Sequence, residues 1–185
     1  PELLCLQQSH PELVFDYRFA PNPDVEKAIA ESTVDIGFMT AKSTLAEVSC
    51  TPIAQESLLL VTPATVEEPD WETLMTLGFI DHPDGSHHAG LLLGANYTEF
   101  QHSSLFPRKG FSNQIGLILE PVSLGLGFAV LPAHAVEAFE KSEGIKAHRL
   151  SHPVSETLYL SVPRNRSLQA RMNTVIAEAK RWLNG

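Results

Sequence analysis

The chain has 185 residues, 43% of them hydrophobic and 19% charged, and a formal net charge of −9. These values are typical of an ordinary globular protein and exclude disordered, collagen-like and membrane-bundle classes. Because the negative charge would repel a phosphate backbone and no basic cluster offsets it, we expect no direct binding of nucleic acid. Two cysteines without a CxxC spacing favour a reducing compartment, and no stretch is typical of a signal peptide or a membrane span.

The first forty residues predict a strand, a helix and a second strand. Residues 12–19 alternate apolar and polar side chains, which indicates a half-buried strand. The sequence Asn-Pro-Asp at 22–24 then starts a helix, with Asn22 able to cap it, and the helix runs to about Ser32. Residues 34–39 form a short buried strand, so the three elements predict a crossover unit of parallel sheet.

Two similar apolar strands bracket the middle of the chain. They cover 58–62 and 158–162, and each ends at a proline. The elements predicted between them are helix 71–77, strand 79–82, a helix opening at Ser86, strand 110–112, helix 114–124 stopped by Gly125, strand 127–131, a helix through Val136, and strand 145–150. A C-terminal helix begins after Ser167 as its cap. This pattern predicts two α/β lobes, one formed by 1–57 with 163–185 and the other by 58–162.

The motifs do not indicate an enzyme. Gly125-Leu-Gly127 follows a helix and enters a strand, the reverse of the order that holds a pyrophosphate on a helix N-terminus. Residues 81–88, Asp-His-Pro-Asp-Gly-Ser-His-His, could ligate a metal, but no second ligand cluster has the matching spacing. We interpret them as a turn with Ser86 as the N-cap of the next helix. No catalytic residue, metal or cofactor is therefore predicted.

Polar side chains occur where predicted strands end and helices begin. Ligands of open α/β sheets bind beyond the carboxyl ends of the strands, where helix N-termini offer free N–H groups. The predicted ligand-binding residues at these positions are Asn22, Thr40, Ser86, Ser112 and Asn113. Such donors suit a small polar or anionic molecule, with Phe38, Met39 and Phe111 as apolar walls.

Four segments in order resemble the effector-binding domain of LysR-type transcriptional regulators. They are Val-Asp-Ile-Gly-Phe at 34–38, Glu-Ser-Leu-Leu-Leu-Val at 56–61, Leu-Gly-Leu-Gly-Phe-Ala-Val-Leu-Pro at 124–132 and Leu-Tyr-Leu-Ser-Val-Pro-Arg at 158–164. The resemblance implies a periplasmic-binding-protein-like fold of type 2, with two Rossmann-like lobes joined by two crossing strands and an effector in the cleft between them. It also implies that the cleft contacts fall near the five predicted residues.

The resemblance has further implications for partners. The family's domain normally opens with another strand, and its winged helix-turn-helix binds DNA, but this chain shows neither. We therefore expect a bacterial cytoplasmic regulator that contacts DNA only through a domain absent from this chain. A homodimer or homotetramer is expected, paired through an apolar surface of Leu3, Leu4, Leu6 and Val14. The alternatives are a periplasmic solute-binding protein and a small metal-dependent hydrolase built on residues 81–88.

Overall fold

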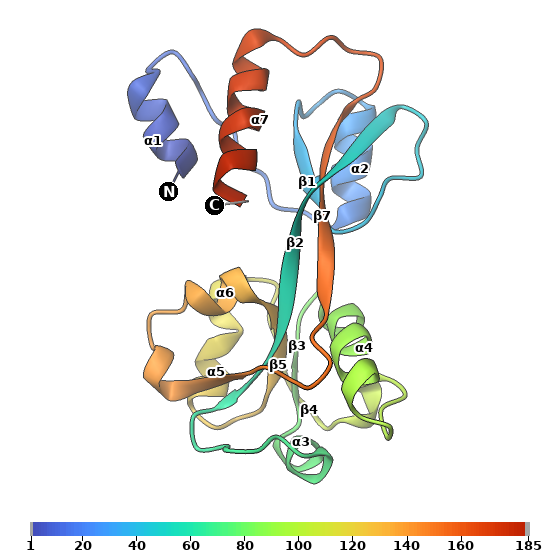
Figure 1. The fold of residues 1–185 in the computed structure, drawn as a ribbon, viewed down its shortest axis with the longest axis vertical. Coiled ribbons are helices and arrows are strands. Elements are labelled where there is room, and N and C mark those ends of the chain that lie inside the picture. The colour runs from blue at the N-terminus through green and yellow to red at the C-terminus, as the bar shows by residue number, and fades with distance from the viewer. Residues whose placement is uncertain (1, 184–185) are drawn as a thin grey trace. The chain divides into compact units, whose positions relative to one another are not determined.

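The computed structural model describes residues 2–183, and the chain divides into two compact units. Unit 1 comprises Pro1–Gln55 and Thr157–Gly185, and unit 2 comprises Glu56–Glu156. Each unit combines helices with strands (Figure 1), so the α/β class predicted from the sequence is confirmed. The structure divides the chain at 55/56 and 156/157, whereas the lobe boundaries expected from the sequence were 57/58 and 162/163.

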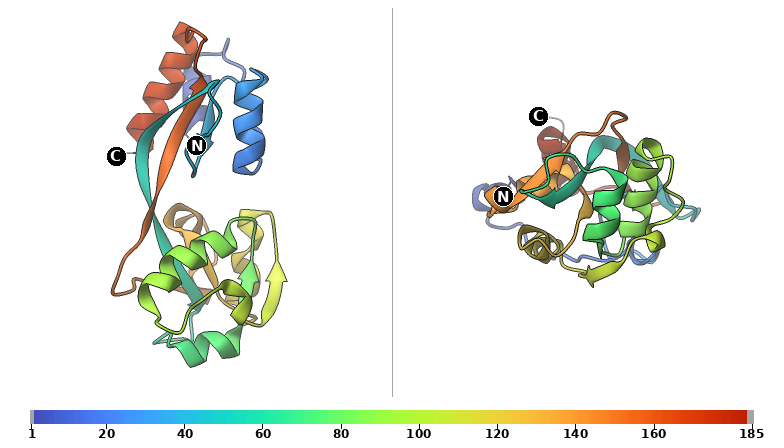
Figure 2. Two further views of the ribbon diagram at one scale, coloured as in Figure 1. Left: turned by 90° about the vertical axis from the view of Figure 1, so that its right-hand side faces the viewer. Right: turned by 90° about the horizontal axis from the view of Figure 1, so that it is seen from below.

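Unit 1 holds its strands between helices. Its elements are α1 (Glu2–Ser9), α2 (Asn22–Ala30), β1 (Gly37–Met39), the first part of β2 (Val48–Pro63), the second part of β7 (Ser155–Pro163) and α7 (Ala170–Leu183). Figure 2 shows α7 and α2 on opposite sides of these strands. The C-terminal helix predicted from its apolar stripe is confirmed, because Met172, Ile176 and Ala179 are spaced by three or four residues and all are buried.

The strand predicted over residues 12–19 is wrong. The structure has no strand there, and the side chains of Val14 and Phe19 are 89% and 96% exposed. Alternation produces a strand only where a neighbour supplies backbone hydrogen bonds, and among residues 2–183 no strand pairs with this segment. The parallel crossover predicted there is also wrong, since β1 pairs antiparallel with β7, with Phe38 opposite Leu160.

Unit 2 contains the end of β2, the start of β7 and most of the predicted α/β pattern. Its helices and strands are α3 (Trp71–Leu77), β3 (Phe79–Asp81), α4 (Gly85–Asn96), β4 (Arg108–Phe111), α5 (Leu119–Ser123), β5 (Ala129–Pro132), α6 (Ala133–Glu137) and β6 (Ile145–His148). Three 3₁₀ turns are η1 (Ser103–Leu105), η2 (Ile115–Leu117) and η3 (Ser142–Gly144). β2 pairs antiparallel with β5 and β6, whereas β3 and β4 are parallel.

The core of unit 2 is aromatic on one side and aliphatic on the other. Phe79, Phe106 and Phe128 pack against leucines of α3 and α4, and the rings of Phe106 and Phe128 meet edge to face at 4.9 Å. A second cluster includes Ile80 and Val122. The two clusters bury β3 on both faces, which fixes the position at which β3 ends and α4 begins.

The helix predicted over 114–124 is interrupted. It consists of η2 and α5, separated at Ile118, because the ring of Pro121 is incompatible with a continuous turn over Leu117, its i−4 residue. Gly125 ends the helical segment with a φ of +80°, as predicted for a helix stop. At Gly127 the chain packs closely against the backbone of Gly78. A Cβ on Gly127 would lie 2.9 Å from the Gly78 carbonyl oxygen.

Candidate functional site

The predicted unit 1 residues, Asn22 and Thr40, are hydrogen-bonded to each other. Asn22 is the first residue of α2, and Thr40 directly follows β1. The Nδ2 of Asn22 donates to Thr40 Oγ1 at 2.9 Å, and the Thr40 backbone N–H donates to Asn22 Oδ1 at 3.2 Å. The cap predicted for Asn22 is wrong, since Pro21 holds that position and the Asn22 side chain bonds Thr40 instead. Thr40 keeps its own hydroxyl hydrogen for a further acceptor.

Sequence reasoning missed Glu26, which holds the loop after Thr40. Its carboxylate accepts hydrogen bonds from the Ser43 hydroxyl and from the backbone N–H groups of Thr44 at 2.7 Å and Leu45 at 3.1 Å. These donors, led by Ser43, lower the pKa of Glu26. The carboxylate therefore binds the loop to α2 in its ionised form. A glutamate on an amphipathic helix gave no signal of this role.

In unit 2, Ser86 lies in the first turn of α4, but it does not cap the helix. The N-cap position belongs to Asp84 and the helix begins at Gly85, so the predicted cap is wrong. Gly85 is required by close packing, because a Cβ there would lie 2.5 Å from Asp81 Oδ1 and 3.2 Å from the His82 ring. The chain therefore turns tightly out of β3, and the Ser86 hydroxyl takes no part in capping.

The Ser86 hydroxyl belongs to a small polar network with η1. Ser103 Oγ donates to Ser86 Oγ at 3.0 Å, and His102 Nε2 lies 3.2 Å from the same oxygen. His102 Nδ1 accepts the backbone N–H of Ser104 at 3.1 Å, so in the neutral ring the hydrogen resides on Nε2. His102 therefore donates to Ser86.

This tautomer decides what Ser86 can do. A Ser–His pair resembles a nucleophile with its general base, but a base needs an unprotonated nitrogen facing the hydroxyl. His102 presents a hydrogen to Ser86 instead. With donors from His102 and Ser103 occupying the lone pairs of its oxygen, Ser86 retains its own hydrogen to donate. The geometry thus leaves the Ser86 hydroxyl hydrogen available to an acceptor and places no unprotonated His102 nitrogen against it.

Ser112 and Asn113 follow β4 at the same edge of the small parallel sheet. Asp81 pairs with Phe111, and the backbone N–H of Ser112 donates to the Asp81 carbonyl at 3.1 Å. The Ser112 hydroxyl is occupied by Gln114, accepting from its N–H at 3.0 Å and donating to its carbonyl at 3.1 Å. Asn113 is exposed. Because β3 and β4 are parallel, α4 and this turn adjoin the same ends of the strands.

The histidines of residues 81–88 have separate partners. His82 is buried and its Nε2 lies 2.9 Å from the Val130 carbonyl oxygen, while burial lowers its pKa. His88 is buried beside Glu156, with 3.2 Å between Nε2 and Oε1. Within residues 2–183, no group of three or more potential ligands is arranged to hold a metal. The proximity of His88 and Glu156 could not be predicted from the sequence, because the two residues are far apart in the chain.

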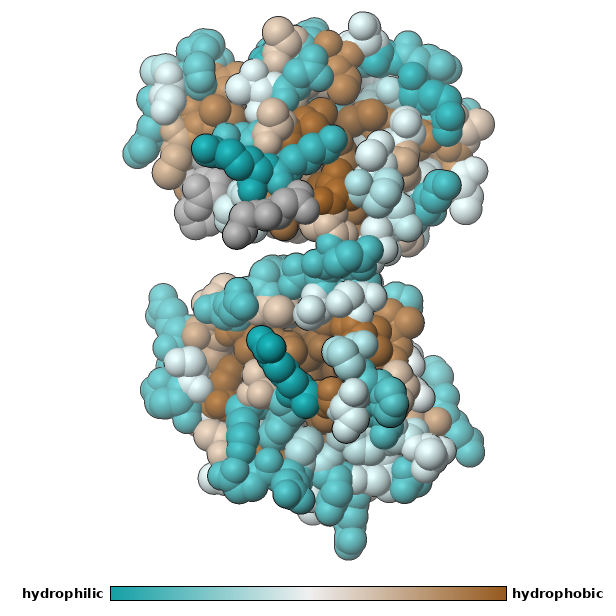
Figure 3. Space-filling view, viewed as in Figure 1, coloured by the Kyte–Doolittle hydropathy of each residue, from teal (hydrophilic) through white to brown (hydrophobic). Residues whose placement is uncertain are grey.

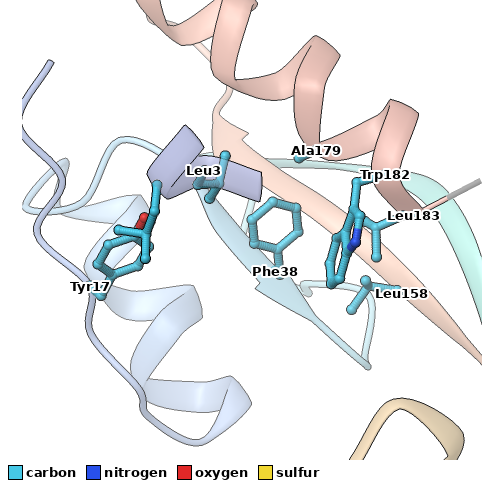
Figure 4. Close-up of a pocket in the computed structure, with 8 residues that line it drawn as sticks. Leu3, Tyr17, Phe38, Leu158, Ala179, Trp182 and Leu183 are labelled. Carbon is cyan, nitrogen blue, oxygen red and sulfur yellow. The ribbon is translucent and has the colours of Figure 1, made fainter. Parts of the chain in front are cut away.

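Unit 1 also contains an apolar cavity of about 460 Å³. Figure 4 shows its wall of apolar and aromatic side chains from α1, the segment after it, β1, β7 and α7, namely Leu3, Leu4, Tyr17, Phe38, Leu158, Ala179, Trp182 and Leu183. Apolar side chains are also exposed between hydrophilic ones on the face of unit 1 seen in Figure 3. Phe38, expected as a wall of the polar site, lines this cavity instead, while Met39 is buried at 2% exposure.

The comparisons with known proteins identify a family. A family model described as the LysR substrate binding domain matches residues 3–184. No curated protein sequence matches the chain. Among residues 2–183, none of the helices is both long and apolar enough to cross a membrane.

Solved structures share the fold at low sequence identity. The regulatory domain of Synechocystis CcmR in complex with 2-PG has a TM-score of 0.75 at 13% identity, over 100% of this chain and 90% of that one. The effector binding domain of QuiR in complex with shikimate has a TM-score of 0.70 at 13% identity, over 99% and 88%. The family match and these structures confirm the type 2 periplasmic-binding-protein-like fold.

Longer relatives extend beyond the region matched by this chain. The LysR family regulator PA01 of Pseudomonas aeruginosa has a TM-score of 0.74 at 14% identity, over 100% of this chain but 65% of the regulator. This chain thus spans about two thirds of such a protein. Since the family model covers almost every residue, the chain belongs to the LysR substrate binding domain family, as its sequence motifs predicted.

Proposed function

We propose that this chain is the ligand-sensing part of a bacterial, cytoplasmic transcriptional regulator. Its ligand is a small polar or anionic effector that takes contacts from Ser86, Ser112 and Asn113 in unit 2 and from Asn22 and Thr40 in unit 1. DNA contact is made by a domain outside this chain, in a homodimer or homotetramer, and no reaction is catalysed. The observation that carries the proposal is the Ser86 hydroxyl, fixed as a donor by His102 and Ser103.

The hydrogen-bond inventory specifies the ligand's chemistry. Ser86 and Thr40 each accept from protein donors and so have a hydroxyl hydrogen left, which a ligand oxygen can accept. The N–H groups at the start of α4 add donors and a favourable dipole for negative charge. A carboxylate or a carbonyl oxygen meets these requirements. An ammonium group does not, because it offers only donors.

The apolar cavity of unit 1 is unsuited to the same ligand. A polar group placed among its apolar and aromatic side chains would lose its hydrogen bonds to water without full replacement, which costs on the order of 1–3 kcal/mol per group. A polar effector therefore binds at the hydroxyl sites. The recorded complexes of QuiR with shikimate and of CcmR with 2-PG support a small-molecule ligand for a domain of this fold.

A ligand screen with matched variants tests the proposal. Small carboxylates and their uncharged analogues are screened by thermal shift, and hits are confirmed by calorimetry. Ser86→Ala and Asn113→Ala should each lower the affinity for a confirmed ligand by about 5- to 150-fold, equivalent to about 1–3 kcal/mol. Each substitution removes a hydrogen-bond partner of a ligand group that has lost its water. Ser167→Ala, an exposed serine after β7, serves as the control and should bind normally. Unchanged affinity in both test variants would show that the ligand binds elsewhere.

A further inference from the structure

The loop that follows β1 is held by one face of α2. It runs from Thr40, a predicted ligand-binding residue, to Leu45. Asn22 and Glu26 are four residues apart in α2, so their side chains project from the same face of the helix. Asn22 is hydrogen-bonded to Thr40 at the start of the loop, and Glu26 is hydrogen-bonded to Leu45 at its end. The helix therefore fixes both ends of the loop.

The contacts of Glu26 converge on a single oxygen. Its Oε1 accepts the Ser43 hydroxyl and the backbone N–H groups of Thr44 at 2.7 Å and Leu45 at 3.1 Å, and the Thr44 hydroxyl lies 3.4 Å away. We call the Ser43 hydroxyl and these two N–H groups the donor cluster. Consecutive N–H groups directed at one point are an arrangement with which proteins bind anions. Here the protein itself supplies the anion, as the carboxylate of Glu26.

A second anchor of the loop is neutral. The backbone N–H of Ser43 donates to Cys50 Sγ at 3.3 Å. The Ser161 hydroxyl donates to Met39 Sδ at 3.3 Å, which leaves the Cys50 thiol to donate to the Ser161 oxygen at 3.2 Å. Sulfur is a weak donor and a weak acceptor, whereas hydrogen bonds to an ionised group are about twice as strong as neutral ones. The carboxylate of Glu26 is therefore the stronger of the two anchors.

From this geometry we propose that Glu26 is a positioning residue for the effector site, because its carboxylate acts as a built-in anion that the donor cluster binds. The consequence for the effector rests on the proposed function, in which Thr40 is a contact. With the carboxylate bound, the loop presents Thr40 in one place before any effector arrives. Without it, the apparent affinity falls by the fraction of molecules in which the loop has moved away.

The substitution Glu26→Ala can be complemented by a small molecule. It removes Cγ, Cδ and both carboxylate oxygens, and these four heavy atoms correspond to those of acetate. Acetate is therefore the matched probe for an empty donor cluster, and acetamide is its uncharged counterpart of the same shape. Glu26→Gln keeps the length of the side chain and one acceptor oxygen but not the charge. Alanine and glutamine both favour helices, so α2 is retained in either variant.

Amide exchange rates measured by NMR test the proposal without any effector. The Leu45 N–H reports the donor cluster, and the Thr40 N–H, which donates to Asn22 Oδ1, reports the position of Thr40. In Glu26→Ala, protection of Leu45 should fall by roughly tenfold and that of Thr40 by a smaller factor, while Glu26→Gln should lie between this variant and wild type. Acetate should restore both amides of Glu26→Ala in a saturable way.

The controls separate a bound anion from a general effect on the helix. Sodium chloride at the same ionic strength and acetamide at the same concentration should restore neither amide, and acetate should not change Leu45 in wild type. Glu31→Gln removes an exposed carboxylate of the same region, 3.9 Å from Lys27 Nζ, and should match wild type. Unchanged exchange of Leu45 in Glu26→Ala would overturn the proposal. Failure of acetate to restore it, or equal restoration by acetamide, would do the same.

The result is distinguishable from a failure of the proposed function. The exchange rates are measured with no effector present, so they report the loop whether or not an effector binds there. Normal exchange in Glu26→Ala, together with ligand binding that is lost in Ser86→Ala, would reject the role of Glu26 and retain the proposed function. A confirmed carboxylate of the screen that binds Thr40→Val as tightly as wild type would contradict the unit 1 contacts of the proposed function, and with them the consequence for the effector.

Discussion

Replacing Phe128 by alanine should destabilise unit 2 selectively. The Phe128 side chain is fully buried, and its ring lies 4.9 Å from that of Phe106 and 5.3 Å from that of Phe79. Truncating a fully buried phenylalanine costs about 3–5 kcal/mol through lost burial and the cavity left behind. Loss of the two ring contacts favours the upper part of this range. Because small domains have only about 5–15 kcal/mol of stability, the variant should lose a large fraction of it.

The two tryptophans allow this effect to be assigned to a unit. Trp71 lies in unit 2, 5.0 Å from the Phe106 ring, whereas Trp182 lies on α7 in unit 1. In a Trp182→Phe background, urea unfolding followed by fluorescence reports unit 2. With a slope of about 1–3 kcal/mol per molar urea, the midpoint should fall by at least about 1 M. Phe111→Ala, which removes a side chain that is 53% exposed, should cost at most about 1 kcal/mol. Equal midpoints for the Phe128 variant and wild type would refute the packing argument.

Four further predictions concern packing, titration and binding. Gly127→Ala should lower the melting temperature of unit 2, since its Cβ would lie 2.9 Å from a backbone oxygen, whereas Gly116→Ala, with open space around it, should not. Tyr97, whose hydroxyl donates to the Pro69 carbonyl at 2.5 Å, has its pKa raised by burial to about 12, so ultraviolet titration should show one of three tyrosines ionising late. The stability that this tyrosine provides is complete below about pH 10 and is lost as the pH rises through about 12. Burial lowers the pKa of His82, so stability should depend on pH in the opposite direction to that for Tyr97. The contribution of His82 to the free energy of unfolding is present above about pH 6.5 and falls on acidification. This fall should be smaller in His82→Gln when unfolding is measured across pH. Because the chain carries a net charge of −9, which salt screens, an anionic effector should associate faster as salt is added. A slower rate in stopped-flow measurements would contradict the proposal that uncharged hydroxyl and N–H donors, and no fixed cation, bind the effector.

Local patterns predicted the elements that depend on local interactions. The helix at Trp71–Leu77 begins after Asp70, whose carboxylate accepts the Thr73 N–H at 2.8 Å, and α7 follows its apolar stripe. The failed strand at 12–19 has the correct alternation but lacks a neighbouring strand among residues 2–183, and the residues themselves contain no information on that neighbour. Strand patterning is therefore necessary but not sufficient.

For the candidate residues, the sequence predicted the elements that carry them better than the hydrogen bonds that they make. The sequence placed Ser86 at the start of a helix after β3, which the structure confirms within one turn. The hydrogen bonds of the Ser86 hydroxyl come from His102 and Ser103, at the start of η1, and the tight turn before it depends on the proximity of Gly85 to Asp81. The local sequence pattern contains no information on these contacts. The same is true of His88 and Glu156, brought together only by the tertiary fold.

The division of the chain into units has a consequence for the order in which they fold. Unit 2 is one continuous segment, Glu56–Glu156, whereas unit 1 needs two segments that flank it. During synthesis, all residues of unit 2 are present before the rest of β7 and all of α7 have been made, so unit 2 is able to fold first. Once it has done so, the ends of its chain are held together by β2 and β7, and the loop-closure entropy that unit 1 would otherwise face is largely removed. Unit 1 is therefore the later-forming half, and a ribosome-bound chain should acquire it only when α7 emerges.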